Sequence, residues 1–360
     1  MRRFSLDSEF SPSRRLFTKR LSAALFGAFV GGRRLFAQDA ANKDASKNAA
    51  SDAAPDAPSK PIYVRKGADP WILEFRGKYI WSQSNNPTRQ IVLSIGDTPD
   101  KPGRPRPVWT APEKGPYSRE LWAPEIHFID GRFYIYFAAD DGKNENHLTY
   151  VLVSENDDPF SEYRLEGPLY TGDDFEGKTN NRWAIDSTLF EHKGKRYLIW
   201  SGWEDHRDIQ YLYAAPMKSP TETAGPRVKL CDNADFLWER VEERLGTRGL
   251  NEGPELVVAP NGRTFVSYSC GASWLPTYKV ALLEFVGDDP LDPASWRKHD
   301  KPFLQSDENL FGVGHGSFVR DANGQTLYFY HAKLDRSPGW NRAVYYRPVE
   351  FDADGLPRLK

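Results

Sequence analysis

The stretch "AIDSTLFEHKGKRYLIWSGW", residues 184–203, decides the fold of this chain. Asp186 precedes an apolar run that reads as a β-strand. A turn containing Gly194 follows, and then a second run rich in aromatic and branched residues. Two such runs around a short glycine turn indicate a β-hairpin. A carboxylate at the start of a strand is common, so its meaning depends on whether the arrangement recurs.

The same pattern occurs five times along the chain. The hairpins cover residues 71–84, 126–139, 184–203, 256–269 and 317–332. Their turn glycines are Gly77, Gly131, Gly194, Gly262 and Gly324, separated by 54, 63, 68 and 62 residues. This spacing leaves room for two further strands per unit, with candidates at 148–155, 209–217, 278–286 and 343–351. Four antiparallel strands repeated around an axis are typical of a propeller blade. The sequence therefore predicts an all-β, five-bladed β-propeller rather than a β-sandwich or an irregular barrel.

Titratable side chains stand ahead of every hairpin. They occur in "ADP", "WAPEIH", "AIDS", "NEGPE" and "GHGS", and they are Asp69, Glu125, Asp186, Glu252 and His315. The first strand of each blade lines the central channel of a propeller, so equivalent strand starts converge near the axis. We therefore expect the five residues to occupy similar positions and to meet at the channel mouth. A turn-capping role explains any one of them but not the whole set.

Crowded carboxyl groups suit glycoside hydrolysis. Like charges in a confined site push carboxyl pKa values apart. The reaction needs one protonated acid at the leaving oxygen and one ionised carboxylate, and a third acid can position the proton donor. The aromatic content of 14% fits a β-rich core and also fits a site in which rings stack on sugar faces.

The motifs "ADPWI", "WAPEIH", "AIDSTLF", "NEGPEL" and "GHGSF", in this order and spacing, resemble glycoside hydrolase family 43. Within that family the match looks closest to exo-acting α-L-arabinofuranosidases that trim α-1,5-arabinan. The resemblance spans residues 61–360 and implies a five-bladed propeller with inverting chemistry. It also implies that Asp69 is the general base, Asp186 the third carboxylate and Glu252 the general acid. In an inverting enzyme, base and acid lie about 6.5–9.5 Å apart, which leaves room for the attacking water.

The resemblance assigns two further residues near these carboxylates. His315 matches the family's axial histidine, which is associated with a metal, commonly calcium, usually held through water. Calcium prefers oxygen ligands, so a neutral hydrogen-bonding histidine is the alternative. Arg342 resembles an arginine that binds sugar hydroxyls, with a surface salt bridge as the alternative. Ser187 stands where the family pattern has glycine, and it adds a hydroxyl near the site.

Aromatic and acidic residues beside the motifs are candidate substrate contacts. Trp71, Trp122 and Trp203 lie at strand ends, where a ring can stack on an arabinofuranose, although core packing is the alternative for each. Glu125 is either a sugar ligand or a structural acid lining the channel. The predicted substrate is a plant-type polysaccharide or oligosaccharide. The alternatives are a β-xylosidase on the same scaffold and a non-catalytic glycan-binding propeller.

Composition and the N-terminal segments place the protein outside the cytoplasm. The net charge of −2, without a basic run in the body of the chain, argues against nucleic acid as a partner. Residues 1–37 resemble an export signal, because Arg14–Arg15 precedes an apolar stretch too short to span a bilayer. An ordinary secretory signal is the alternative to a twin-arginine signal. Both predict a periplasmic or extracellular protein with no membrane span after processing.

The remaining features concern domain limits and cysteines. Residues 38–60 contain no aromatic or β-branched side chain, so they are predicted to be a disordered linker before a catalytic domain at 61–360. Cys231 and Cys270 are the two cysteines, and their spacing does not decide whether they pair. The spacing of motifs says nothing about oligomeric state or about exo versus endo action.

Overall fold

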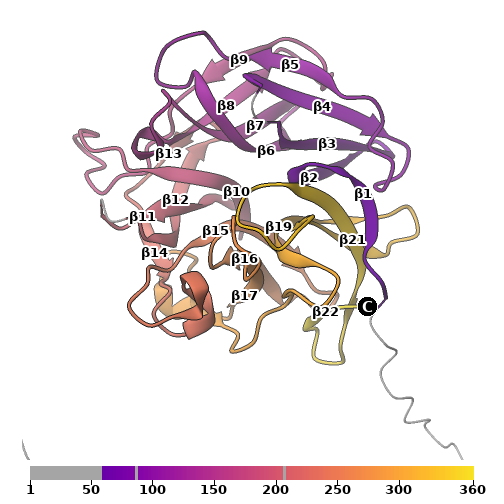
Figure 1. Cartoon of the computed structure of the whole chain (residues 1–360). Helices are drawn as coiled ribbons and strands as arrows, with labels where there is room; N and C mark the ends of the chain where they lie inside the picture. The colour runs from indigo at the N-terminus through magenta and orange to yellow at the C-terminus, as the bar shows by residue number, and fades with distance from the viewer. Residues whose placement is uncertain (1–58, 86–87, 206–207) are drawn as a thin grey trace, which may run out of the picture. The chain divides into compact units, whose positions relative to one another are not determined.

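The computed structural model describes residues 59–85, 88–205 and 208–360, and in these residues the strands form five antiparallel sheets (Figure 1). The first blade consists of β2 (Ala68–Phe75), β3 (Lys78–Ser84), β4 (Gln90–Gly96) and β5 (Arg106–Thr110). The second consists of β6 (Arg119–Ile129), β7 (Arg132–Asp140), β8 (Leu148–Ser154) and β9 (Tyr163–Glu166). The predicted five-bladed β-propeller is confirmed.

The other three blades follow in chain order. The third consists of β10 (Ala184–His192), β11 (Lys195–Trp203), β12 (Gln210–Ser219), β13 (Glu222–Thr223) and β14 (Val228–Cys231). The fourth consists of β15 (Asn251–Val258), β16 (Thr264–Cys270), β17 (Lys279–Phe285) and β18 (Trp296–Lys298). The fifth consists of β19 (Phe311–Arg320), β20 (Thr326–Lys333), β21 (Arg342–Phe351), β22 (Pro357–Leu359) and β1 (Ile62–Lys66). Short 3₁₀ helices occur at Asn144–Asn146, Leu237–Glu239, Val241–Glu243 and Pro293–Ser295.

Strand β1 closes the ring. It pairs with β21 in antiparallel register, with Ile62 opposite Tyr346 and Lys66 opposite Ala343. The last blade therefore combines strands from both ends of the described chain, as Figure 1 shows where indigo β1 runs beside yellow β21. Each innermost strand also contacts the innermost strand of the next blade, in the cyclic order β2, β6, β10, β15, β19 and back to β2. The predicted unit did not include β1, because a five-residue strand carries no hairpin signal of its own.

The predicted glycine turns form tight hairpins. At Arg76–Gly77 the φ angles are 54° and 72°, and at Lys193–Gly194 they are 51° and 73°. Two consecutive residues with positive φ match the right-handed twist of the flanking strands, and glycine adopts this conformation without steric cost.

The hydrophobic core lies between neighbouring blades. One cluster joins the first two blades through residues such as Ile80, Leu93, Ile126 and Phe133. A second cluster joins the third and fourth blades, and other clusters fill the remaining gaps. Alternation along each strand directs apolar side chains into these layers. The starts of the innermost strands are thereby left to line a shared cavity.

The predictions about the N-terminal segments concern residues that precede the propeller. The predicted export signal at 1–37 and nearly all of the predicted linker at 38–60 lie outside the described residues, so these domain limits stay predictions. Within the described residues, no helix has the length and apolar character needed to cross a membrane. Cys231 and Cys270 are both free thiols.

Candidate active site

Each innermost strand carries an irregularity near its start. The pairing register with the second strand shifts there in every blade, between Ala68 and Trp71 in the first and between Glu252 and Glu255 in the fourth. In each blade a residue at such a shift has positive φ, and these residues are Asp69, Ala123, Asp186, Gly253 and His315, while β6 and β19 have a second shift with positive φ at Glu120 and Gly312. A β-bulge re-aims the side chains around it, and bulges are frequent beside active sites. Positive φ is uncommon for non-glycine residues, so a strained backbone repeated in four of the five blades suggests a functional reason.

These register shifts correct the expectation that the five titratable residues occupy similar positions. The five titratable residues do not all occupy equivalent positions, because only Asp69, Asp186 and His315 stand at the positive-φ residue. Glu252 precedes that position by one residue, and Glu125 follows it by two. Motif spacing alone does not show where the bulge falls.

Four of the five side chains nevertheless meet in one cavity of about 1180 Å³. Asp69, Asp186, Glu252 and His315 all line it, and Arg342 joins them from β21. The three carboxylates are 9%, 4% and 9% exposed, respectively, so they lie where water is largely excluded. Residues scattered over the chain are thus brought together by ring closure, as expected.

Asp69 is surrounded by groups that favour its ionised form. Its Oδ1 lies 3.4 Å from Arg342 Nη1, 3.4 Å from His315 Nδ1 and 3.1 Å from His331 Nδ1. Burial alone raises a carboxyl pKa, but Arg342, followed by the two histidines, outweighs it and holds the pKa of Asp69 well below its usual range. Asp69 is therefore a carboxylate at neutral pH.

The tautomer of His331 follows from its neighbours. Arg342 Nη1 lies 3.4 Å from His331 Nε2, and a guanidinium can only donate, so Nε2 accepts. The proton is then on Nδ1, which faces Asp69 Oδ1. The Asp69 backbone nitrogen also lies 3.3 Å from Nδ1, but a protonated nitrogen cannot accept a hydrogen bond from it. Burial, with Arg342, lowers the pKa of His331 to about 3, so the ring is neutral and orients Asp69.

Glu252 has the opposite electrostatic character. Burial, opposed by a hydrogen bond from Tyr278, raises its pKa to about 7. The Tyr278 hydroxyl donates to Glu252 Oε1 at 2.7 Å. Tyr278 is fully buried, and its ring stacks on His331 with a centroid separation of 5.7 Å and an interplanar angle of 5°. A substantial fraction of Glu252 is therefore protonated near neutral pH, while Asp69 is ionised.

Asp186 is near enough to both groups for their charges to act on it. Its Oδ2 accepts a hydrogen bond from the Gly253 backbone at 3.1 Å and lies 3.7 Å from His315 Nδ1. Burial, then the charges of Glu252 and Asp69, raises its pKa well above the usual value. A Cβ on Gly253 would lie 2.8 Å from the His315 ring, so glycine is needed for this close approach. Asp186 thus holds the backbone next to Glu252.

Trp122 lines the cavity as predicted. Its ring stacks on His147 at 3.9 Å, and its Nε1 donates to Glu120 Oε2 at 3.0 Å. Trp183 lines the same wall and stacks on Trp203 at 4.6 Å, with an interplanar angle of 12°. This wall is therefore made of fixed rings.

Three predicted substrate contacts, Trp71, Glu125 and Trp203, do not line the cavity. Trp71 packs on His127 at 4.7 Å, and its Nε1 donates to the Ile126 carbonyl at 2.8 Å. Glu125 is buried, and its Oε2 lies 3.3 Å from His127 Nε2. Trp203 is packed behind Trp183, which occupies the cavity wall in its place. A strand-end position alone does not tell a cavity-lining ring from the ring behind it.

Sequence reasoning also missed Tyr278 and His331. Tyr278 opens one of the predicted third strands, and His331 lies in a predicted hairpin. Both read as ordinary core positions, because neither stands at the start of an innermost strand or within one of the five motifs. No local signal marks them, because each acts on a residue from a distant part of the chain.

The described residues offer no direct ligand set for the predicted calcium near His315. Among residues 59–85, 88–205 and 208–360, no group of three or more His, Cys, Asp or Glu side chains is arranged to hold a metal ion. His315 offers a nitrogen, whereas calcium prefers oxygen. The residues present do not fit a directly ligated calcium. A water-held ion stays a prediction.

Comparison with known proteins identifies the family. The sequence pattern described as Glycosyl hydrolases family 43 matches residues 58–357. The chain belongs to glycosyl hydrolase family 43. It is 29% identical over 288 residues to an extracellular exo-α-(1→5)-L-arabinofuranosidase of Streptomyces chartreusis, covering 77% of this chain and 83% of that one. It is 30% identical to α-L-arabinofuranosidase 43 of Humicola insolens, covering 82% of this chain but only 61% of that longer one.

A solved structure shows the same architecture. The α-L-arabinofuranosidase from Lactobacillus brevis superimposes with a TM-score of 0.74 at 28% identity, covering 83% of this chain and 94% of that one. As a member of family 43, the chain is a glycoside hydrolase. An ionised Asp69 and a Glu252 that is protonated in a substantial fraction near neutral pH lie in one cavity, and they supply the two carboxyl states that inverting hydrolysis requires.

Proposed function

We propose that the protein is an inverting, exo-acting α-L-arabinofuranosidase that releases arabinofuranose from α-1,5-arabinan or arabino-oligosaccharides. The observation that carries the proposal is the split between Asp69 and Glu252, two buried carboxyls in one cavity with opposite pKa shifts. The activities named for the Streptomyces and Lactobacillus relatives support arabinofuranose as the sugar.

In this proposal Asp69 is the general base and Glu252 the general acid. Asp69 takes a proton from water as the water oxygen attacks the anomeric carbon. Glu252 donates its proton to the glycosidic oxygen as the bond to the leaving sugar breaks. The products are arabinose of inverted configuration and a shortened chain, with Asp69 protonated and Glu252 ionised. Exchange with solvent restores both groups.

The other cavity residues position these two. His331 and Arg342 orient Asp69, and Tyr278 orients Glu252. Asp186 fixes the backbone at Gly253. Arg342 lines the cavity beside Asp69, which supports a role in binding a sugar hydroxyl.

We further propose that the protein acts in the periplasm or outside the cell. The extracellular Streptomyces relative and the twin-arginine pattern at residues 14–15 support export. Fractionation of cells expressing the full chain tests this, and activity retained in the cytoplasm contradicts it.

The experiment that tests the activity is anomer-sensitive NMR of the products formed from linear α-1,5-arabinan. The proposal expects monomeric arabinose, released first as the inverted anomer. Release of the retained anomer contradicts the assignment of Asp69 as base. Parallel assays on nitrophenyl arabinofuranoside and nitrophenyl xylopyranoside test the sugar, and dominant xylosidase activity overturns it. Arabinan binding without cleavage overturns catalysis and favours a glycan-binding propeller.

A further inference from the structure

Two loops on the mouth of the cavity are joined to each other. One runs over residues 271–278 between β16 and β17, and the other over residues 334–341 between β20 and β21. The Gly339 backbone donates to the Trp274 carbonyl at 2.8 Å, and Trp340 Nε1 donates to Ser273 Oγ at 3.4 Å. Lys333 Nζ also donates to the Gly339 carbonyl. The loops therefore form one connected rim.

Two tryptophans on this rim, Trp274 and Trp340, form what we call the tryptophan lip. Both line the cavity, and their ring centroids lie 6.2 Å apart at an interplanar angle of 62°. Trp340 is 64% exposed, although leaving an indole in water forgoes a large hydrophobic gain. An exposed ring held on the rim of a binding cavity is a natural contact for a ligand.

Two other tryptophans that line the cavity differ from Trp340 in their exposure and packing. Trp122 and Trp183 are packed on other rings, and Trp183 is only 6% exposed, with its Nε1 donating to the Asn144 carbonyl. Those rings shape the cavity, but little of Trp183 is accessible to a sugar. The lip has the more exposed aromatic surface.

The position of the lip indicates which sugar it meets. The carboxylates that act on the scissile bond are buried, so the leaving part of the chain extends outward to the rim. Glu252 protonates the leaving oxygen, which places the leaving sugar on its side of the cavity. The loop that carries Trp274 ends at Tyr278, whose hydroxyl donates to Glu252. The lip therefore lies on the leaving-group side.

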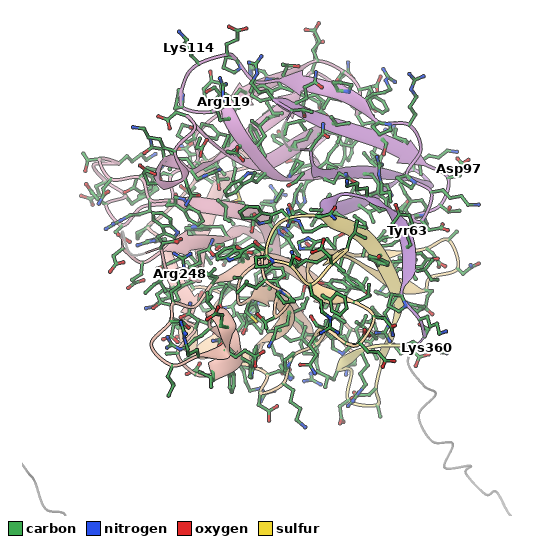
Figure 2. All side chains as sticks on the ribbon, viewed as in Figure 1. Tyr63, Asp97, Lys114, Arg119, Arg248 and Lys360 are labelled. Atoms are coloured by element: carbon green, nitrogen blue, oxygen red, sulfur yellow. The ribbon has the colours of Figure 1, made fainter. Side chains whose placement is uncertain are left out.

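Polar groups beside the lip complete the site. The Arg248 guanidinium lies 5.7 Å from the Trp274 ring centroid, lines the cavity, and forms an ion pair with Asp208, which also lines it. Asn341, next to Trp340, lines the cavity as well. A furanose presents a C–H face for a ring and hydroxyls at its edge for such groups. Figure 2 labels Arg248 at the surface, among the side chains of the third and fourth blades.

We propose that the tryptophan lip binds the arabinofuranosyl unit on the reducing side of the scissile bond, so that the enzyme prefers oligosaccharides over substrates with a small leaving group. This inference rests on the proposed function, because it takes Glu252 as the acid and arabinofuranose as the sugar. The lip contributes contact area by stacking and takes no part in proton transfer.

The test compares kcat/KM for arabinotriose and for arabinofuranosyl fluoride, which carries no leaving sugar. Trp340→Ala is expected to lower kcat/KM on arabinotriose by about tenfold. On the fluoride, the same variant stays within about twofold of wild type. Trp340→Phe retains most of the arabinotriose activity, because a smaller ring still stacks. Equal effects of Trp340→Ala on both substrates, or no effect on either, overturn the proposal.

The matched control is Tyr63→Ala. Tyr63 is 57% exposed on β1 and does not line the cavity, and Figure 2 shows it on the side of the view opposite Arg248. This variant leaves both rates unchanged. Calorimetric titration of Glu252→Gln with arabinotriose, with and without Trp340→Ala, separates the lip from the proposed function. An affinity loss of about tenfold supports the lip even where the acid assignment fails. Equal affinity, or no arabinotriose binding at all, overturns it.

Discussion

Glu252 and Glu255 lie three residues apart on β15, on either side of the bulge, and they have similar burial but different surroundings. They are 9% and 5% exposed, respectively. Glu252 receives the Tyr278 hydroxyl and has a pKa raised to about 7. Glu255 Oε2 has no hydrogen-bond partner among the described residues, and burial raises the pKa of Glu255 well above its ordinary value.

The same contrast holds between Asp69 and Glu125 on two other innermost strands. Arg342 and two histidines keep Asp69 ionised. Burial, followed by the charge of Glu255, keeps Glu125 protonated well above its ordinary pKa. Burial without a cation nearby therefore keeps a carboxyl neutral, even at Glu125, which has a hydrogen bond from Thr188. Arg342 makes the buried Asp69 a base, and the Tyr278 hydroxyl together with Arg342 keeps the pKa of Glu252 near neutral.

The largest expected effect comes from Asp69→Asn. We expect kcat on arabino-oligosaccharides to fall by about 10³- to 10⁴-fold, since no base then activates the water. The matched control is Glu125→Gln, the same chemical change at a buried carboxyl without cationic neighbours, which keeps kcat within about threefold. Steady-state kinetics on both variants test the contrast. Comparable losses of kcat in the two variants contradict a catalytic role that is specific to Asp69.

Removing the cation beside Asp69 is expected to have the next largest effect. In Arg342→Gln the charge that favours ionised Asp69 is lost, so the pKa of Asp69 rises. The acidic limb of the kcat/KM profile then moves to higher pH, with a loss of about 100-fold at neutral pH. A pH–rate profile measures this. A lower rate with an unmoved acidic limb assigns Arg342 to sugar binding alone.

Tyr278→Phe tests how the neighbouring hydroxyl sets the pKa of the general acid Glu252. The hydroxyl lowers the pKa of Glu252, so its removal raises that pKa above about 7 and moves the alkaline limb to higher pH. We expect kcat near neutral pH to fall about tenfold, because Glu252 loses a charge-assisted hydrogen bond. Tyr330→Phe is the control, since the Tyr330 hydroxyl has no partner among the described residues. An alkaline limb that stays in place in Tyr278→Phe contradicts the assignment.

Glu255→Gln is expected to have the smallest effect on activity, within about twofold. Its readout is stability, followed as Tm against pH. The folded-state pKa of Glu255 is raised above the ordinary 4.5, so its stabilising contribution is complete below about 4.5 and is lost as pH rises. Wild type therefore loses more stability than Glu255→Gln as the pH rises above about 4.5. Parallel Tm curves show instead that Glu255 is ionised or solvated.

The fold was largely predictable from local patterns. Hairpins such as 71–84 combine strand residues with a glycine turn, and both signals are local. The near-even spacing then indicated repeated blades. Strand β1 was missed because its partner β21 lies at the other end of the chain, and pairing across that separation leaves no local trace.

The catalytic carboxyls of the site were predictable because each of them stands in a sequence motif at the start of an innermost strand. Asp69, Asp186 and Glu252 were predicted to meet and do line one cavity. Glu125 was grouped with them because the sequence does not show the bulge, and a shift of two residues moves a side chain away from the cavity. His331 acts on Asp69 through its tautomer, which Arg342 determines. Tyr278 acts on Glu252 through its hydroxyl, while its ring stacks on His331. Both effects depend on neighbours that only the folded propeller brings close.

The most direct test of the account is the pH dependence of kcat/KM on an aryl arabinofuranoside, an activated substrate on which acid variants retain measurable rates. Wild type and Glu255→Gln should both show an alkaline limb near pH 7, set by Glu252. In Glu252→Gln that limb should disappear while the acidic limb remains. Persistence of the alkaline limb in Glu252→Gln, or its loss in Glu255→Gln, would show that another group is the acid.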